Sequence, residues 1–423
     1  MTHSILQKGS GRFFPLNALV KFILLFVLVF LVCISPSYFL PVHQVSNSGE
    51  TRGVWITNVN SGVLYLPGGI DRSLRQLSQL QFNTVYPVVW NRGFTFYPSD
   101  LARQEIGKSQ QPLLSWAHIG GDALQKITRR AHQHKMRVIP WFEYGLIVPA
   151  SSELIQKHPD WVTRGFTGRT QISYEDELEA TSDGSNSILR PRPIEQVWLN
   201  PFRPDVQKFL TGLILEVVKN YHIEGIQLDD HFGLPVQLGY DDWTIALYKL
   251  EHGGDFPPAN IYDRDWMRWR AAKLTNFLAR IRQEIKKVKP DVIISLSPNS
   301  YGFAYRHYLQ DWTTWVQKGL VDEIVLQVYR DNLKKFGVEL SQAAVKFAKK
   351  QVPVSVAILS GTWNRPIKIE QIEAQVKYTR QQKFKGVSFF YWETLWGYFT
   401  PESPRQRRQV FQTLFQRKEK VEA

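Results

Sequence analysis

The seven residues GIQLDDH, at positions 225–231, decide how the fold of this chain is interpreted. Gly225 opens a short apolar run, and that run ends directly in Asp229, Asp230 and His231. Buried strands of parallel sheets are short apolar runs, and ligands bind beyond the carboxyl ends of such strands. The stretch therefore predicts a buried strand that carries acidic side chains to a functional site.

The same design repeats along the chain from Arg52 onward, where short β-rich runs alternate with longer helical patterns. This alternation is typical of βα units around a parallel sheet. Strands are predicted at 53–57, 84–90, 137–142, 225–229, 292–296, 323–328, 354–359 and 386–391. Helical patterns follow at 72–80, 122–134, 204–221, 265–288, 312–318, 340–350, 369–382 and 405–415.

Eight strands with eight helices is the count of an α/β fold of the (β/α)8 TIM-barrel type, which we expect over residues 52–416. An open doubly wound sheet is the alternative, because periodicity does not distinguish closed from open sheets. Long loop insertions follow the third strand (145–203) and the fourth strand (231–264). Since the active site of a barrel lies at the carboxyl ends of its strands, we expect these loops to form its walls.

An apolar run near the N-terminus, FILLFVLVFLVCI at 22–34, follows the basic residues Lys8, Arg12 and Lys21. This pattern predicts that residues 1–42 are a signal peptide or membrane anchor helix that exports the bulk of the chain. A buried core segment is the alternative. Residues 43–51 are expected to be a linker and 417–423 a charged tail. The expected location is exported, either membrane-anchored or periplasmic or extracellular.

The net charge of +14 favours anionic partners. An anionic membrane or cell-wall polymer accounts for this charge, and nucleic acid is not expected because the recognised nucleic-acid-binding motifs are missing from the sequence. Cys33 is the only cysteine, which excludes an intrachain disulfide and a cysteine-based metal site. The sequence has no phosphate loop, dinucleotide fingerprint or Gly-x-Ser-x-Gly elbow, so no cofactor is expected.

The candidate catalytic residues are carboxylates that follow the predicted strands. Glycoside hydrolysis uses two carboxyl groups, one as acid and one as nucleophile or base. Neighbouring strand residues point to opposite faces, so Asp229 and Asp230 are not expected to face a substrate equally. One of them then needs a partner, for which Glu143 and Glu393 are the candidates and Asp331 a third. Helix capping or salt bridging is the alternative role of the pair.

Other polar and aromatic residues near the strand ends are expected to contact the substrate, because aromatic rings stack on sugar rings. These residues are Trp55, Asn58, Trp90, Asn91, Trp141, Tyr144, His231, Gln327, Tyr329, Asp331 and Trp392. A metal site of the Asp/Asp/His type is an alternative use of residues 229–231. No metal is expected, because the sequence offers no obvious fourth ligand.

An ordered series of motifs resembles the glycosyl hydrolase-like 10 family, once called domain of unknown function 187. The motifs are RGVWIT (52–57), FNTVYP (82–87), WLNP (198–201), GIQLDDH (225–231) and LQVY (326–329). Together with WFEYG, DDHFGLP, LQVYRDN and GVSFFYWETLW, they look like the cyanobacterial type of that family. The resemblance covers about residues 51–400.

The resemblance implies a barrel fold, export and action on a cell-envelope or extracellular polysaccharide, and some relatives cleave peptidoglycan glycan strands. The family's acidic pair corresponds to Asp229 and Asp230, whereas Glu143 stands where relatives commonly have asparagine. The expected function is thus an exported glycoside hydrolase with carboxylate acid/base catalysis and a polysaccharide substrate. The alternative is a non-catalytic carbohydrate-binding or envelope-scaffold barrel.

Overall fold

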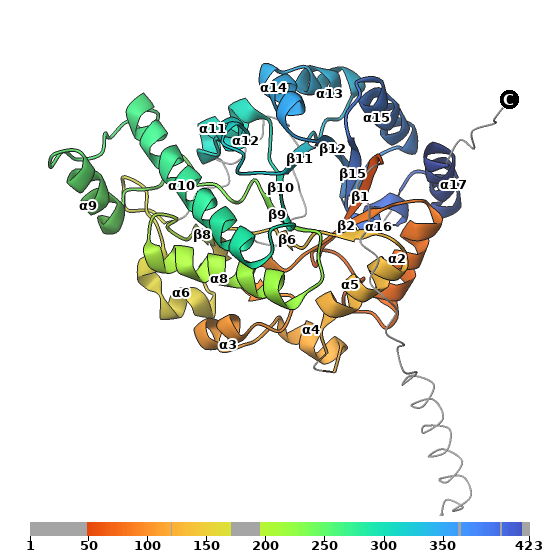
Figure 1. The fold of residues 1–423 in the computed structure, drawn as a ribbon, viewed down its shortest axis with the longest axis horizontal. Helices are drawn as coiled ribbons and strands as arrows, with labels where there is room; N and C mark the ends of the chain where they lie inside the picture. The colour runs from red at the N-terminus through yellow and green to blue at the C-terminus, as the bar shows by residue number, and fades with distance from the viewer. Residues whose placement is uncertain (1–48, 120, 171–194, 363–364, 398–399, 417–423) are drawn as a thin grey trace, which may run out of the picture. The chain divides into compact units, whose positions relative to one another are not determined.

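One curled parallel sheet organises the computed structural model, which describes residues 49–119, 121–170, 195–362, 365–397 and 400–416 (Figure 1). Its strands are β1 (Thr51–Ile56), β2 (Thr84–Pro87), β5 (Arg137–Val138), β6 (Trp141–Phe142), β9 (Gly225–Asp229), β10 (Ile293–Ser297), β11 (Glu323–Gln327), β12 (Val354–Leu359) and β15 (Gly386–Phe390). Their order is β5-β2-β1-β15-β12-β11-β10-β9-β6. All eight predicted strands are present, the third of them in two pieces.

The two ends of the sheet are consecutive pieces of the third strand. β5 pairs with β2, and β6 pairs with β9. Pro140 lies between the pieces and has no N–H to donate, which interrupts the ladder at that point. A parallel bridge also joins Val88 to Trp141. The sheet therefore curls until its ends meet at this segment, and its strands follow one another in chain order. An open doubly wound sheet would instead reverse its order at a switch point.

Helices cover the outside of the sheet (Figure 1). Those that correspond to the predicted helical patterns are α2 (Gly69–Gln79), α5 (Ala123–Gln133), α8 (Pro204–Asn220), α10 (Arg264–Val288), α12 (Trp312–Gln317), α14 (Ala343–Gln351), α15 (Ile369–Gln381) and α17 (Pro404–Phe415). α8 shows why they form: Pro204 occupies the first turn, and Val206, Leu210, Leu213 and Val217 make one buried stripe.

Short elements that the sequence did not predict lie between these units. They are the helices α3 (Asp100–Ile106), α4 (Pro112–Ala117), α6 (Glu153–Lys157), α9 (Asp242–Glu251), α11 (Tyr301–Tyr308), α13 (Leu333–Leu340) and α16 (Trp392–Trp396), the 3-10 turn η1 (Pro159–Trp161), and the strands β3 (Trp90–Asn91), β4 (Phe94–Thr95), β7 (Ile147–Pro149), β8 (Gln196–Trp198), β13 (Gly361–Thr362) and β14 (Arg365–Pro366). Most are too short for a periodic signal, so tertiary contacts decide their conformation.

The described parts of the predicted insertions carry some of these short elements. Within 145–203, β7 pairs with β8 in an antiparallel direction. Within 231–264, α9 packs against the beginning of α10, and Tyr240, Tyr248 and Trp266 form a small hydrophobic cluster apart from the main core. In Figure 1, α9 lies at one end of the long helix α10.

Polar side chains occupy the inside of the curled sheet. Trp55 Nε1 donates to Gln227 Oε1 at 2.8 Å, and Gln227 Nε2 donates to Ser295 Oγ at 3.0 Å. Nearer the amino ends of the strands, Arg137 and Glu323 form a buried ion pair at 3.1 Å. Most buried polar groups in proteins are bonded, and these side chains bond one another across the sheet. The interior is thus filled by a connected polar layer rather than by hydrocarbon alone.

The predicted export segment, residues 1–42, lies outside the described residues, as do the tail 417–423 and most of the linker. The rest of the linker is partly in the sheet, because β1 begins at Thr51. Among the helices of the described ranges, none is long and apolar enough to cross a membrane. The signal or anchor helix stays a prediction.

The buried pair Arg137–Glu323 gives a test of the interior. Replacing Glu323 with alanine leaves a buried guanidinium without its carboxylate, and we expect a loss of about 3–5 kcal/mol in the free energy of unfolding. Chemical denaturation followed by circular dichroism measures this loss. The matched control is Glu373→Ala, which breaks the exposed pair Lys377–Glu373 and should cost less than about 1 kcal/mol. Equal losses in both variants would contradict the described interior.

Candidate active site

A pocket opens at the carboxyl ends of the strands, with a volume of about 430 Å³ that includes space open to solvent. Ten residues line it: Trp55, Trp141, Glu143, Asp229, Asp230, His231, Ser297, Gln327, Tyr329 and Phe390. Eight of these are predicted site residues, and the sequence analysis missed Ser297 and Phe390. The strand-end prediction thus brings eight of its residues into one pocket.

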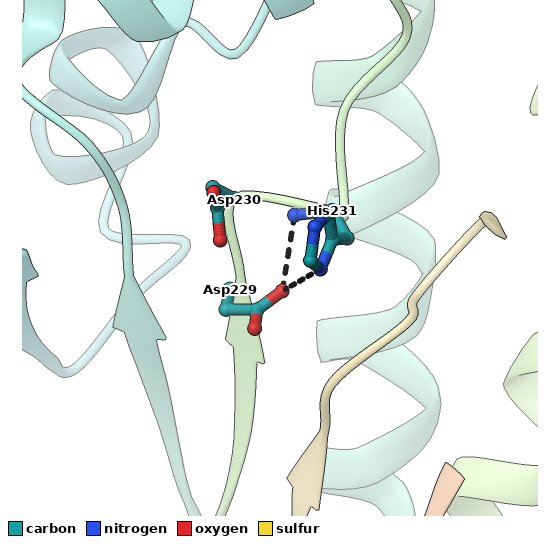
Figure 2. Close-up of side chains that lie close together, drawn as sticks. All are labelled: Asp229, Asp230 and His231. Carbon is teal, nitrogen blue, oxygen red and sulfur yellow. Dashed lines mark hydrogen bonds and ion pairs between the residues drawn. The ribbon is translucent and has the colours of Figure 1, made fainter. Parts of the chain in front are cut away.

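Asp229 is the last residue of β9 and is buried. Trp141 Nε1 donates to its Oδ2 at 2.8 Å. The backbone N–H of His231 donates to its Oδ1 at 3.0 Å (Figure 2). Burial raises the pKa of Asp229 well above its usual range, and the charge of Asp230 adds to this effect, while His231 opposes it.

Asp230 lies in the turn that follows β9 rather than in the strand itself. Asn299 Nδ2 donates to its Oδ2 at 2.9 Å, and Gln327 Nε2 donates to its Oδ1 at 3.0 Å. Strand alternation predicted that Asp229 and Asp230 would not face a substrate equally. The strand ends at Asp229, and both side chains line the pocket. They still differ, since Asp229 is buried and Asp230 is half-buried.

His231 connects the acidic pair to strand three. Its Nδ1 lies 2.7 Å from the carbonyl oxygen of Glu143 and 3.5 Å from Asp229 Oδ1. Burial lowers the pKa of His231, but the charges of Asp230 and Asp229 outweigh burial and raise the pKa to about 9. An imidazolium at neutral pH thus offsets part of the negative charge of the pocket.

Glu143 directly follows β6 and is buried. Asn91 Nδ2 donates to its Oε2 at 2.5 Å, and Thr57 Oγ1 lies 3.4 Å from the same oxygen. Burial raises the pKa of Glu143 to about 7, although His231 and Arg92 oppose the shift. A carboxyl group with this pKa can hold a proton near neutral pH and release it to a substrate.

Several predicted site residues lie outside the pocket lining. Asn91 donates to Asn58 Oδ1 at 2.8 Å as well as to Glu143, so both asparagines support the carboxyl group from behind. Trp90 is fully buried, and its Nε1 donates to the carbonyl oxygen of Gly145 at 3.1 Å, which makes it a core residue. None of these three residues lines the pocket, so their role as substrate contacts stays a prediction.

Tyr144 and Trp392 also lie outside the pocket lining, and their role as substrate contacts stays a prediction. The ring of Tyr144 meets His231 edge-on, and its hydroxyl accepts a hydrogen bond from Gln196 Nε2 at 2.9 Å. Tyr144 therefore packs beside the pocket-lining histidine. Trp392 begins α16, and its ring packs against the ring of Trp396 in the same helix. Neither ring lines the pocket.

The structure places only one of the three candidate partner carboxylates in the pocket with Asp229 and Asp230. Asp331 lies at the surface and pairs with Lys335, so the third candidate is away from the pocket. Glu393 is buried, and burial raises its pKa to about 7. However, it lies in the first turn of α16, where it accepts a hydrogen bond from Ser61, and it does not line the pocket. Glu143 is the candidate that shares the pocket with the pair.

Residues 229–231 also present three ligand atoms within 4.8 Å of one another. Protein N–H groups already bond both oxygens of each carboxylate. His231 Nδ1 faces the carbonyl oxygen of Glu143, so Nδ1 carries a proton and Nε2 is the ring nitrogen left to bind a cation. The expectation that no metal binds here stays a prediction.

The sequence analysis missed two lining residues, and only one of them could have been predicted from the sequence. Ser297 follows the fifth predicted strand, and Asn299, which holds Asp230, comes two residues later. The rule that polar residues follow strand ends could have found both. Phe390 is an apolar residue within a predicted strand, and nothing in the sequence distinguishes it from core.

A curled βα sheet with carboxyl groups and aromatic rings at the carboxyl ends of its strands is the arrangement that barrel-type glycoside hydrolases have. The glycosyl hydrolase-like 10 family model matches residues 50–380, so the chain belongs to that family. The resemblance seen in the sequence motifs is confirmed.

Relatives and solved structures agree with this assignment. "Glycosyl hydrolase DigH" of Escherichia coli K12 is 26% identical over 329 residues, which cover 68% of this chain and 67% of that protein. "Glycosyl hydrolase YngK" of Bacillus subtilis 168 is 24% identical, over 66% of this chain and 54% of that protein.

Among solved structures, the PgaB (BpsB) glycoside hydrolase domain of Bordetella bronchiseptica has a TM-score of 0.57 at 14% identity, covering 86% of this chain and 99% of that one. The β-amylase catalytic domain of Paenibacillus polymyxa has a TM-score of 0.56 at 11% identity, covering 88% of this chain and 99% of that one. At these identities the likeness shows the fold alone.

The raised pKa of Glu143 predicts how its removal changes stability. Because the folded protein holds this proton more tightly than the unfolded chain, burial of Glu143 becomes costly as pH rises from about 4.5 to about 7. Glu143→Gln keeps the acceptor for Asn91 and removes the charge. It should stabilise the protein at pH 8, by up to roughly 3 kcal/mol, and have little effect at pH 4.

Thermal unfolding at the two pH values measures this difference. The control is Asp331→Asn, since a hydrogen bond from Lys335 lowers the pKa of this exposed carboxyl group and its removal should not stabilise the protein at pH 8. A Glu143→Gln effect of the same size at pH 4 and pH 8 would show that the charge of Glu143 is not the cause.

Proposed function

We propose that this protein hydrolyses glycosidic bonds, with Glu143 as general acid and Asp230 as nucleophile or base. One observation supports this most: a single pocket contains a carboxyl group that holds its proton near neutral pH and a second one held by two amide donors. Glycoside hydrolysis needs one protonated and one ionised carboxyl group on either side of the scissile bond.

The steps follow from these positions. Glu143 gives its proton to the departing glycosidic oxygen, so that the bond to the anomeric carbon can break. Asp230 either removes a proton from the water that attacks that carbon, or attacks the carbon itself. In the second case water, deprotonated by Glu143, then displaces Asp230 and releases the sugar. The amide N–H groups of Asn299 and Gln327 stabilise the ionised carboxylate and fix its direction. Asp229, which bonds Trp141, is proposed to position its neighbour.

Aromatic rings supply a surface for the sugar. Trp55 and Trp141 meet edge-on at 6.3 Å, Phe390 contacts both, and Tyr329 lies tilted against Phe390 at 5.9 Å. All four rings line the pocket with the carboxyl groups. A pocket lined by both aromatic rings and carboxyl groups suits a sugar ring, which has apolar C–H faces and polar edges.

The central test is the formation of new reducing ends from purified polysaccharides. We expect Asp230→Asn and Glu143→Gln each to lower turnover by roughly 10²–10⁴-fold, while Asp331→Asn leaves it unchanged. For the wild type, activity should fall as pH rises through about 7, because Glu143 then loses the proton that it must donate. Wild-type protein that binds glycans without cleaving them would instead support a non-catalytic carbohydrate-binding barrel.

We propose further that the substrate is a cell-envelope or extracellular polysaccharide, with peptidoglycan glycan strands as the class to test first. The family assignment and the basic charge support this choice. The apolar run at 22–34 supports export, with residues 1–42 as signal or anchor.

Protease treatment of intact cells tests the location. An exported protein should be cleaved from outside once any outer barrier is opened, and deletion of residues 1–42 should leave the protein protected. Protection of the full chain under the same conditions would contradict export, and an internal cytoplasmic enzyme serves as the control for cell lysis.

A further inference from the structure

Ser297 has a buried hydroxyl group without a protein partner among the described residues, and the residue lines the pocket. It is the last residue of β10, and its side chain is 1% exposed. Its Oγ makes no hydrogen bond within the described ranges, yet the residue lines the pocket. Most buried polar groups in proteins are bonded, so an unbonded one at a binding site needs an explanation.

The sheet register explains why Ser297 lines the pocket. β10 and β9 are parallel, and Ser297 lies opposite Asp229. Two residues earlier, Ser295 accepts a hydrogen bond from Gln227 inside the curled sheet. Because strand side chains alternate with a period of two, Ser297 points to the same inner side as Ser295, one layer nearer the pocket.

The neighbouring polar groups are already occupied. Trp141 Nε1 bonds Asp229, and Asn299 Nδ2 bonds Asp230. Gln327 Nε2 is shared between Asp230 and the backbone oxygen of Ser297 itself. None of these bonds reaches Ser297 Oγ, which leaves this hydroxyl group available to a molecule bound in the pocket.

We propose that Ser297 is a substrate-binding residue whose hydroxyl group hydrogen-bonds a hydroxyl group of the sugar unit held beside Asp229 and Asp230. This inference rests on the proposed glycosidase function and deepens it. A serine hydroxyl both donates and accepts, as a sugar hydroxyl does, so the two groups match. The hydroxyl group is costly to bury in the free protein and becomes satisfied when the sugar binds. Its position beside the carboxyl pair makes it a determinant of which sugar is held for cleavage.

Ser297→Ala in the full chain separates this role from a structural one. Removal of an unsatisfied buried hydroxyl group should raise the melting temperature of the free protein by roughly 1–3 °C, and lower kcat/KM by about 10-fold. The matched control is Ser295→Ala on the same strand, which removes the acceptor of Gln227 and should lower the melting temperature. A purely structural serine would give a loss of stability in both variants.

Monodeoxy glycans identify the contacted hydroxyl group. At one ring position, the deoxy substrate should lose about 10-fold in affinity for the wild type and nothing further for Ser297→Ala. Affinity is measured by calorimetry in the Asp230→Asn background, so that it does not depend on turnover. Glycan binding without turnover would remove the proposed hydrolysis and leave the Ser297 contact testable by this cycle. Equal losses at that position in both proteins, or no glycan binding at all, would overturn the Ser297 proposal.

Discussion

The pairing of β6 with β9 is the interaction on which the geometry of the site depends. Trp141 lies opposite Gln227 in this pairing, and Phe142 lies opposite Leu228. The same alignment lets Trp141 Nε1 reach Asp229 Oδ2 and places the next residue, Glu143, beside the acidic pair. Because strand three is interrupted at Pro140, one half completes the sheet against β2 and the other half carries Glu143 to the pocket. The strand pairing that closes the sheet thus also brings the carboxyl groups together.

Burial of several acids in one pocket opposes folding, since desolvation and mutual repulsion both disfavour their charged forms. The pocket reduces this cost in three ways. Asp229 and Glu143 have raised pKa values and can hold protons, Asp230 is bonded by two amides, and the His231 imidazolium supplies a positive charge. Such perturbed groups cluster at functional sites more often than in structural networks. The extensive apolar core and the hydrogen-bonded polar side chains inside the sheet stabilise the fold and offset the remaining cost.

Sequence patterns predicted the fold and eight of the ten residues that line the pocket. The strands were predictable because buried parallel strands leave apolar runs between helices, and the acidic pair was predictable because β9 ends in it. Features of the site that depend on tertiary contacts were not predictable from the sequence. Glu393 follows a strand as Glu143 does, yet the short helix α16 turns it away, and no periodic signal marks a helix of that length. Trp90 and Trp141 look alike in sequence, but only the fold buries one in the core and turns the other to the pocket.

The most direct measurement of the central claim is a crystal structure of the Glu143→Gln variant with a bound oligosaccharide. The account predicts a sugar unit against the aromatic rings of Trp55 and Trp141, with the side chain at position 143 within hydrogen-bonding distance of a glycosidic oxygen. Asp230 should then lie near the anomeric carbon of that sugar. A glycan bound at another surface, or in this pocket with its glycosidic oxygen far from both residues 143 and 230, would contradict the account.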